Sequence, residues 1–449
     1  MKPGPMVGLF FFRRQATAMQ SKDLLFESFR AAVAAADPAR VIAPCVRPLA
    51  DSGARRVFVG GAGKAAAAMA AAFDAAWPAD VPLEGLVVTR YGHGQEAGRI
   101  EVVEAGHPMP DEAGMAAAGR MLAAAAGLTA DDLLVVLLSG GGSSLLALPV
   151  SPLSLADLRE LTAALLASGA PIDEMNTVRR HLSRIQGGWL AASTPARVHA
   201  LVISDVAGDD LAAVASGPCS ADPSSHADAL EVLRRWRIEA PAAARAWLEA
   251  GARGEAPETP KPGDPRLART ETRLVGSGHA SLEAAARRLE AEGIASIVLG
   301  DTITGEARDV ARVHAGIVRE LRAHGERSFG ERGRRPVALL SGGECTVTVR
   351  GKGRGGRNTE FLLALADALG PLPDVWALAA DTDGIDGVMD NAGAILAPDT
   401  LARAAAAGLD PRARLDDNDG YGFFEALGDL VLTGPTRTNV NDFRLILLR

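Results

Sequence analysis

The sequence has little cysteine, few aromatic residues, no excess of basic charge and no long apolar run. Three cysteines among 449 residues, with no CxxC pair, give neither a disulfide framework nor a cysteine zinc site. The net charge of −8 offers no long-range attraction to nucleic acid or to an anionic membrane. No stretch reaches the roughly 18 apolar residues that a membrane span needs. These absences predict a cytoplasmic protein that acts on small molecules, with no nucleic-acid or membrane partner.

The chain is long enough for two globular domains. Short apolar runs, each followed by a glycine-rich turn and a helical pattern, recur along it, for example at 56–60, 133–138 and 272–276. Such repeats predict parallel sheets in an α/β fold. We expect residues 22–262 to form a Rossmann-like N-terminal domain and residues 270–449 a smaller α/β C-terminal part, separated by the Pro- and Gly-rich segment 251–270.

The first residues, 1–21, have no pattern that fits either domain. Their apolar run is short, contains glycine and is followed by two arginines, unlike a signal peptide. We expect a disordered or over-extended segment. Translation starting at Met19 is the alternative to a start at Met1.

A glycine-rich cationic stretch at 337–360 is the clearest candidate for an anion site. Four cations alternate with four glycines, and no carboxylate lies between Cys345 and Thr359. Glycine lets the backbone approach a ligand, and arginine matches the geometry of phosphate oxygens. The alternative is a hairpin whose edge strand carries cations, which explains Arg350 but not Arg357 at a helix start. The predicted anion-binding residues are Gly342, Gly343, Glu344, Gly355, Gly356, Arg357 and Asn358.

Two other predicted strands are each followed by a glycine-rich turn. Lys64 stands at the start of a helix, where a cation strengthens a site already suited to anions. The surrounding GxGxxA is also the looser dinucleotide fingerprint, so an NAD(P)H-dependent reductase stays open. His93 and His107 lie in nearby loops, where most histidines have no ligand, and we leave them out. The predicted phosphate-binding residues here are Gly61, Gly63, Ser139, Gly140, Gly141, Gly142, Ser143 and Ser144.

Acidic residues follow two other predicted strands. Asp205 ends the run at 200–205, and four aspartates crowd the exit of 375–381. Neighbouring carboxylates repel one another unless a cation shares them. Mg²⁺ is favoured over Ca²⁺, because EF-hand spacing is missing; a solvated acidic loop is the alternative. We predict Asp205, Asp383 and Asp386 as metal ligands, with Asp205 or Asp386 as the group that accepts or orients a hydroxyl proton. Together with Lys64 and Arg357, this set suits phosphoryl transfer.

From about Leu24 to its end, the chain resembles the type II glycerate kinases (glycerate 2-kinases), whose C-terminal half is the MOFRL domain. Nine motifs occur in order: GAGKAAAAM at 61, TRYGHG at 89, EAGHPMPDEAG at 104, LLSGGGSSLLALP at 137, NTVRRHLS at 176, ISDVAGDDLAAVASGP at 203, LLSGGECTVTVRGKGRGGRNTEF at 339, TDGIDG at 382 and TGPTRTNVNDFRL at 433. Residues that depart from the usual motifs are Trp189, Val388, Met389, Gly420 and Arg437, which stands where TGPTGTN is usual.

The resemblance implies a Rossmann-like N-terminal domain, a MOFRL segment at 334–444 and an active site in the cleft between the domains. It implies ATP-dependent phosphorylation of D-glycerate at the 2-hydroxyl, giving 2-phosphoglycerate and ADP, with Mg²⁺. Its functional residues fall on Lys64, Arg357, Asp205 and Asp383 or Asp386, and we add Arg179 of NTVRRHLS as a substrate-binding residue. It also leaves room for a homodimer. The alternatives are a hydroxypyruvate reductase and a nucleotide sensor without turnover.

Overall fold

The computed structural model describes residues 5–449, with side chains from residue 20 onward. Its contacts group these residues into two units. The parallel-sheet unit comprises Asp37–Ser277 and Arg437–Asn439, and the mixed-sheet unit comprises α1 (Pro5–Ala35) with Ala36, Gly278–Thr436 and Val440–Arg449. The parallel-sheet unit is therefore inserted into the sequence of the other.

The parallel-sheet unit contains a six-stranded sheet of order β3-β2-β1-β4-β5-β6, in which every pair is parallel. This is the order of the doubly wound dinucleotide-binding fold, so the predicted Rossmann-like sheet is confirmed. All residues of β1 and β4 are buried, which explains their continuous apolar runs. The strands are β1 (Val57–Ala62), β2 (Glu84–Arg90), β3 (Ile100–Ala105), β4 (Leu133–Leu138), β5 (Arg197–Ile203) and β6 (Thr270–Gly276).

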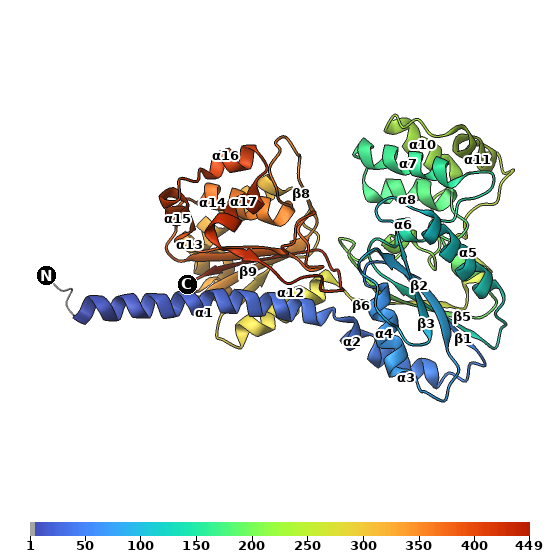
Figure 1. The fold of residues 1–449 in the computed structure, drawn as a ribbon, viewed down its shortest axis with the longest axis horizontal. Coiled ribbons are helices and arrows are strands. Elements are labelled where there is room, and N and C mark those ends of the chain that lie inside the picture. The colour runs from blue at the N-terminus through green and yellow to red at the C-terminus, as the bar shows by residue number, and fades with distance from the viewer. Residues whose placement is uncertain (1–4) are drawn as a thin grey trace. The chain divides into compact units, whose positions relative to one another are not determined.

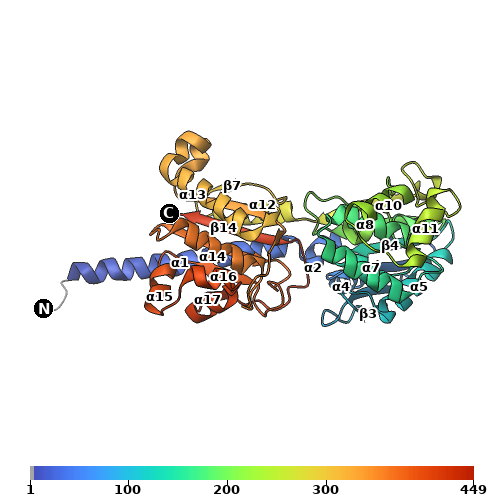
Figure 2. The same ribbon diagram turned by 90° about the horizontal axis from the view of Figure 1, so that it is seen from above.

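Helices cover both faces of this sheet (Figure 1). One face packs against α5 (Glu112–Ala126), α6 (Gly142–Leu145) and α9 (Trp189–Ala192). The other carries α4 (Ala66–Ala76), which contacts α2 (Pro38–Val41) and α3 (Ala43–Ala50). Beyond the sheet, a helical cluster with its own core gathers α7 (Leu155–Ser168), α8 (Ile172–His181), α10 (His226–Arg235) and α11 (Ala242–Ala252), as Figures 1 and 2 show.

The mixed-sheet unit has six strands in the order β13-β12-β11-β14-β9-β7. Only β7 and β9 pair in parallel; β14 is antiparallel to both β9 and β11, and β12 is antiparallel to β11 and β13. The parallel sheet expected here is therefore corrected to a mixed one. A loop, without a crossover helix, joins β11 to β12, and such a connection permits antiparallel pairing. The strands are β7 (Ala295–Val298), β9 (Val337–Gly343), β11 (Val375–Asp381), β12 (Gly393–Leu396), β13 (Leu430–Val431) and β14 (Asp442–Leu448).

Two helix layers enclose the mixed sheet. On one face lie α1 and α12 (Gly278–Glu290) (Figure 1). Leu25 and Phe29 of α1 pack against Phe443 and its neighbours. The other face carries α13 (Ala307–Phe329), α14 (Arg357–Leu369), α15 (Thr400–Ala406), α16 (Pro411–Asp416) and α17 (Gly420–Leu427). A short parallel pair, β8 (Gly305–Glu306) with β10 (Cys345–Thr346), completes the unit.

The unit boundaries differ from those expected in two places. The apolar face of α1 is buried on the mixed sheet, although we expected residues from 22 onward in the N-terminal domain. The strand at Thr270–Gly276 is the edge of the parallel sheet, so the chain changes unit after Ser277 and not within 251–270. Within that segment, Thr259 is buried and its hydroxyl donates to Asp222 Oδ2 at 3.0 Å, so part of it is packed.

Candidate functional site

Three loops meet at the carboxyl ends of β1, β4 and β5. The Lys64 N–H donates to the Gly140 carbonyl at 2.8 Å, and the Ala65 N–H donates to Ser139 Oγ at 3.0 Å. A Cβ atom on Gly140 would lie 2.2 Å from the carboxylate carbon of Asp205, so a larger residue here would displace that carboxylate. The structure thus brings together the predicted residues Lys64, 139–144 and Asp205. In open α/β sheets this edge is where ligands bind.

His107, which follows β3, lies beside the same loops at this edge of the sheet. A Cβ on Gly141 would lie 2.8 Å from His107 Nε2 and 3.4 Å from Lys64 Cγ. Burial, together with the charges of Lys64 and Arg90, lowers the pKa of His107 to about 4. The imidazole is therefore neutral at neutral pH. The sequence prediction omitted this residue. Its position just after a predicted strand could have identified it as a site residue.

Asn439 holds the Asp205 carboxylate and is a second residue that the prediction omitted. Its side-chain N–H donates to Asp205 Oδ2 at 3.0 Å. Two residues earlier, Arg437 has φ +61°, a left-handed conformation that favours glycine, and its guanidinium donates to Gln95 Oε1 at 2.6 Å. Both residues lie in the motif TGPTRTN at 433–439.

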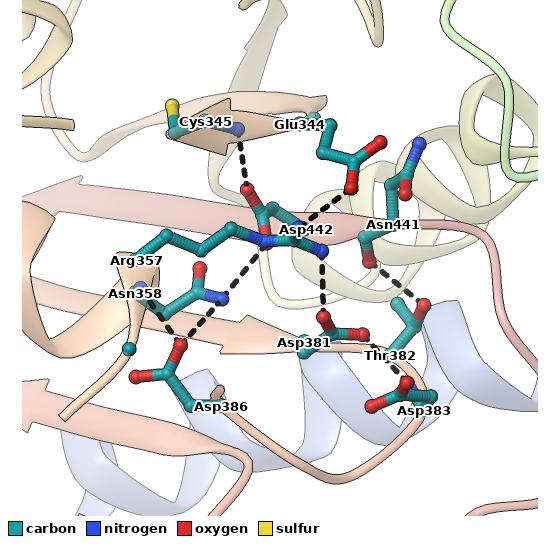
Figure 3. A network of polar contacts seen from close by, with 12 residues as sticks. Glu344, Cys345, Arg357, Asn358, Asp381, Thr382, Asp383, Asp386, Asn441 and Asp442 are labelled. Atoms are coloured by element: carbon teal, nitrogen blue, oxygen red, sulfur yellow. Dashed lines mark hydrogen bonds and ion pairs between the residues drawn. The ribbon is translucent and has the colours of Figure 1, made fainter. Parts of the chain in front are cut away.

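In the mixed-sheet unit, Arg357 lies at the centre of a carboxylate network (Figure 3). Its guanidinium donates to Asp442 at 2.6 Å, and to Asp381 and Glu344 at 2.7 Å each. Burial opposes the charge, but the carboxylates of Asp442, Asp381 and Glu344 raise the pKa of Arg357 well above its usual value. The cation predicted from the sequence is thus already surrounded by acids.

Asp386 caps the start of α14, from which Arg357 projects. Its two carboxylate oxygens accept the N–H groups of Asn358 and Thr359 at 2.9 Å each and the Thr359 hydroxyl at 2.8 Å. Burial raises the pKa of Asp386. The Asn358 amide also donates to Asp442 Oδ1 at 2.8 Å. Asp386 and Asn358 therefore fix the arginine and one of its partners in position (Figure 3).

The cationic loop before α14 does not form the cradle of inward amides that we expected. The N–H groups of Arg350 and Gly351 donate to Asn418 Oδ1 at 2.7 and 3.0 Å, and that of Lys352 donates to Asp417 Oδ1 at 2.9 Å. A Cβ on Gly351 would lie 2.3 Å from the Asp417 Cα. The glycine here serves close packing against 417–419. The hairpin alternative is not found either, because β10 pairs in parallel with β8.

The predicted metal ligands belong to different units, Asp205 to the parallel-sheet unit and Asp383 and Asp386 to the other. Within residues 5–449, no three His, Cys, Asp or Glu side chains are arranged to hold an ion directly. Around Arg357, however, acids outnumber cations: Glu344, Asp381, Asp383, Asp386 and Asp442 stand against Arg357 and Arg444. This surplus fits a hydrated Mg²⁺, which takes one or two carboxylates from a protein.

Comparisons with known proteins agree with this architecture. Residues 24–249 match the family described as "Domain of unknown function (DUF4147)" and residues 337–442 match the MOFRL family. Glycerate 2-kinase of Pyrococcus horikoshii is 37% identical over 94% of this chain and 96% of its own length. The crystal structure of a glycerate kinase from Thermotoga maritima has a TM-score of 0.85 at 38% identity, covering 96% of this chain and all of that one (100%).

Another relative carries a different name. A protein of Agrobacterium vitis, provisionally named a hydroxypyruvate reductase, is 52% identical over 96% of this chain and 95% of its own length.

The fold and these relatives define a two-domain α/β enzyme of the phosphotransferase class. Within that class, the chain belongs to the glycerate 2-kinase family with a DUF4147 region and a C-terminal MOFRL domain. No helix among residues 5–449 has the length and apolar character needed to cross a membrane.

Proposed function

We propose that this enzyme transfers the γ-phosphoryl group of ATP to the 2-hydroxyl of D-glycerate, giving 2-phosphoglycerate and ADP. The observation that supports this most is the meeting of Lys64, the glycine-rich loop at 139–144 and Asp205 at one sheet edge. Lysine and loop amides suit phosphate oxygens, and a carboxylate beside them suits a hydroxyl.

The reaction needs a proton acceptor and charge neutralisation. We assign the acceptor role to Asp205, whose Oδ2 is oriented by Asn439. As the bond from the hydroxyl oxygen to phosphorus forms and the bond to the ADP oxygen breaks, the hydroxyl proton passes to this carboxylate. Bound Mg²⁺ would neutralise phosphate charge, and we propose Asp383 as a protein ligand for it.

Arg357 is proposed to contact the transferring phosphoryl group. Of its three acidic partners, Glu344 has the most exposed side chain, at 54%, against 7% for Asp381 and 0% for Asp442. We propose that a phosphate oxygen replaces Glu344 at this guanidinium when ATP binds. Asp386, predicted as a base or metal ligand, is better suited to positioning, because its oxygens already hold α14.

The test measures turnover of Lys64→Ala and Arg357→Ala with D-glycerate, ATP and Mg²⁺. Each should lower kcat by about 10²-fold or more, because each removes a charge that stabilises the transition state. ADP is measured by a coupled assay and 2-phosphoglycerate by phosphorus NMR, and thermal unfolding confirms that the variants are folded. Near-normal turnover in both variants would contradict the assignment.

A reductase is the second candidate, favoured by the 3-2-1-4-5-6 strand order and by the name of the Agrobacterium relative. It predicts oxidation of NADPH by hydroxypyruvate, whereas the kinase predicts ADP formed in proportion to glycerate. Both activities are measured on the same preparation. NADPH oxidation without ADP formation would replace the kinase proposal, and nucleotide binding without either product would indicate a sensor.

A further inference from the structure

Two adjacent arginines at the end of α8 have opposite surroundings. Arg180 donates to Asp222 Oδ1 at 3.3 Å and to the Ala212 carbonyl at 2.6 Å. Arg179 donates to the neutral Asn176 Oδ1 at 3.3 Å and forms no ion pair with any residue among 5–449. Burial alone lowers the pKa of Arg179. A desolvated cation without an acid is costly, so an anionic ligand is the partner that this position lacks.

Arg179 lines a small cavity whose size limits the ligand. Ser143, Ser144 and Gln186 complete its polar wall, and Leu148 and Leu158 supply apolar wall. Its volume is about 20 Å³. One water needs about 10–15 Å³ of such space, so the cavity suits the end of a carboxylate and not a triphosphate.

The polar groups of this cavity differ in whether they can donate a hydrogen bond to a ligand. Ser143 is engaged with the Ser216 hydroxyl at 2.8 Å, and Gln186 donates to the Ser143 carbonyl at 2.7 Å. The Ser144 hydroxyl donates to the Gly141 carbonyl over a long 3.3 Å. Ser144 can exchange that weak bond for a ligand, so it is the donor that can join Arg179.

The same network connects the cavity to the proposed catalytic edge. Asn176 Oδ1, which orients Arg179, also accepts the Ser216 hydroxyl at 2.9 Å. Ser216 and its neighbour Ala215 have φ values of +58° and +52°, a strained pair of non-glycine residues. The charges of Lys64 and Arg179 both lower the pKa of His107, so Arg179 interacts electrostatically with the groups at the proposed catalytic edge.

We propose that Arg179 and Ser144 bind the carboxylate of the phosphoryl acceptor, so that this enzyme selects small hydroxy acids over neutral polyols. This assignment rests on the proposed function, because it places one end of the acceptor in the kinase reaction. It makes Arg179 a specificity-determining residue. It assigns to Arg179 no contact with the nucleotide phosphates.

The experiment compares D-glycerate with its neutral amide, D-glyceramide, as acceptors for the wild type and Arg179→Ala. We expect the wild type to prefer the acid by about 100-fold in kcat/KM, and the variant to prefer it by about tenfold or less, because the partner of the carboxylate is gone. Arg179→Lys should be intermediate, since it keeps the charge but loses the planar fork. The KM for ATP should stay within about twofold of the wild type.

Arg180→Lys is the matched control. Arg180 is already paired, so this change should affect the acid and the amide equally and leave their ratio unchanged. An unchanged ratio in Arg179→Ala, or a raised KM for ATP without a changed ratio, would overturn the proposal. If Arg179→Ala does not fold, an unchanged ratio in Arg179→Lys would overturn it equally. A wild type that forms no ADP with glycerate would instead refute the proposed function.

Discussion

Arg357 and His107 owe their opposite charge states to their neighbours. Three carboxylates keep the Arg357 guanidinium charged despite burial, whereas burial and nearby cations keep the His107 imidazole neutral. In the folded protein His107 has a pKa of about 4, below its ordinary value of 6.5. Between these values the unfolded chain binds more protons, so stability falls as the pH falls.

We predict that His107→Gln reduces this acid sensitivity. For the wild type, His107 should contribute a loss of up to about 3 kcal/mol of unfolding free energy as the pH drops from neutral toward 4. Urea unfolding at pH 7, 6 and 5 measures it, followed by fluorescence in a Trp376→Phe background, because the remaining tryptophans belong to the parallel-sheet unit. If the unfolding free energy depends on pH identically in the wild type and in His107→Gln, the lowered pKa of His107 would be contradicted.

At the scale of elements, the start of α14 depends on a residue that the sequence cannot connect to it. The helix begins at Arg357, as the pattern predicted, but its cap is Asp386, across the next strand. Four aspartates among glycines around Asp386 suggested a metal site. The capping role could not be predicted, because the N–H groups that donate to Asp386 belong to a distant part of the sequence.

We predict that Asp386→Asn destabilises the mixed-sheet unit by about 2 kcal/mol, because the new NH₂ group would face the N–H donors of Asn358 and Thr359. Asp367→Asn, near the other end of the same helix, is the control. Its partner Arg412 has a side chain that is 79% exposed, and such surface pairs contribute about 0.5 kcal/mol or less. Equal thermal stability of the two variants would contradict the capping role.

The strand-turn-helix repeats predicted most elements but not all their pairings. In the parallel-sheet unit most consecutive strands are joined through helices, which favours parallel pairing and the doubly wound fold, whereas a loop alone joins the parallel strands β2 and β3. In the mixed-sheet unit, β14 enters between β9 and β11, and no local signal specifies where a strand joins a sheet. We predicted that the glycines at 351–356 approach a ligand. In the structure Gly351 and Gly353 approach the chain at 417–419, and Gly356 approaches Asp386, and no local pattern connects these segments.

At the scale of the whole molecule, the N-terminal helix belongs to the unit formed by the C-terminal half. Phe29 packs on Phe443 with ring centres 5.6 Å apart, and both side chains are 1% exposed. No local pattern in this helix specifies the sheet that buries it. The assignment of α1 to the mixed-sheet unit is open to a direct test.

We predict that Phe29→Ala destabilises the mixed-sheet unit by about 3 kcal/mol, because it opens a cavity between helix and sheet. Hydrogen exchange should quicken in β11 and remain unchanged in β4. Val313→Ala, at a side chain that is 63% exposed, should change neither. Faster exchange in β4 of Phe29→Ala would place the helix with the other unit.

The insertion of one unit within the other has a consequence for biosynthesis. The residues 37–277 are nearly sufficient for the parallel-sheet unit, so a nascent chain can complete most of it while still on the ribosome. The helix made before them packs against α12 and the strands of the mixed sheet, and all of these elements follow the inserted unit in the sequence. During translation its apolar face is therefore exposed to chaperones and to neighbouring chains, and it docks only after the loop that holds the entire inserted unit has closed.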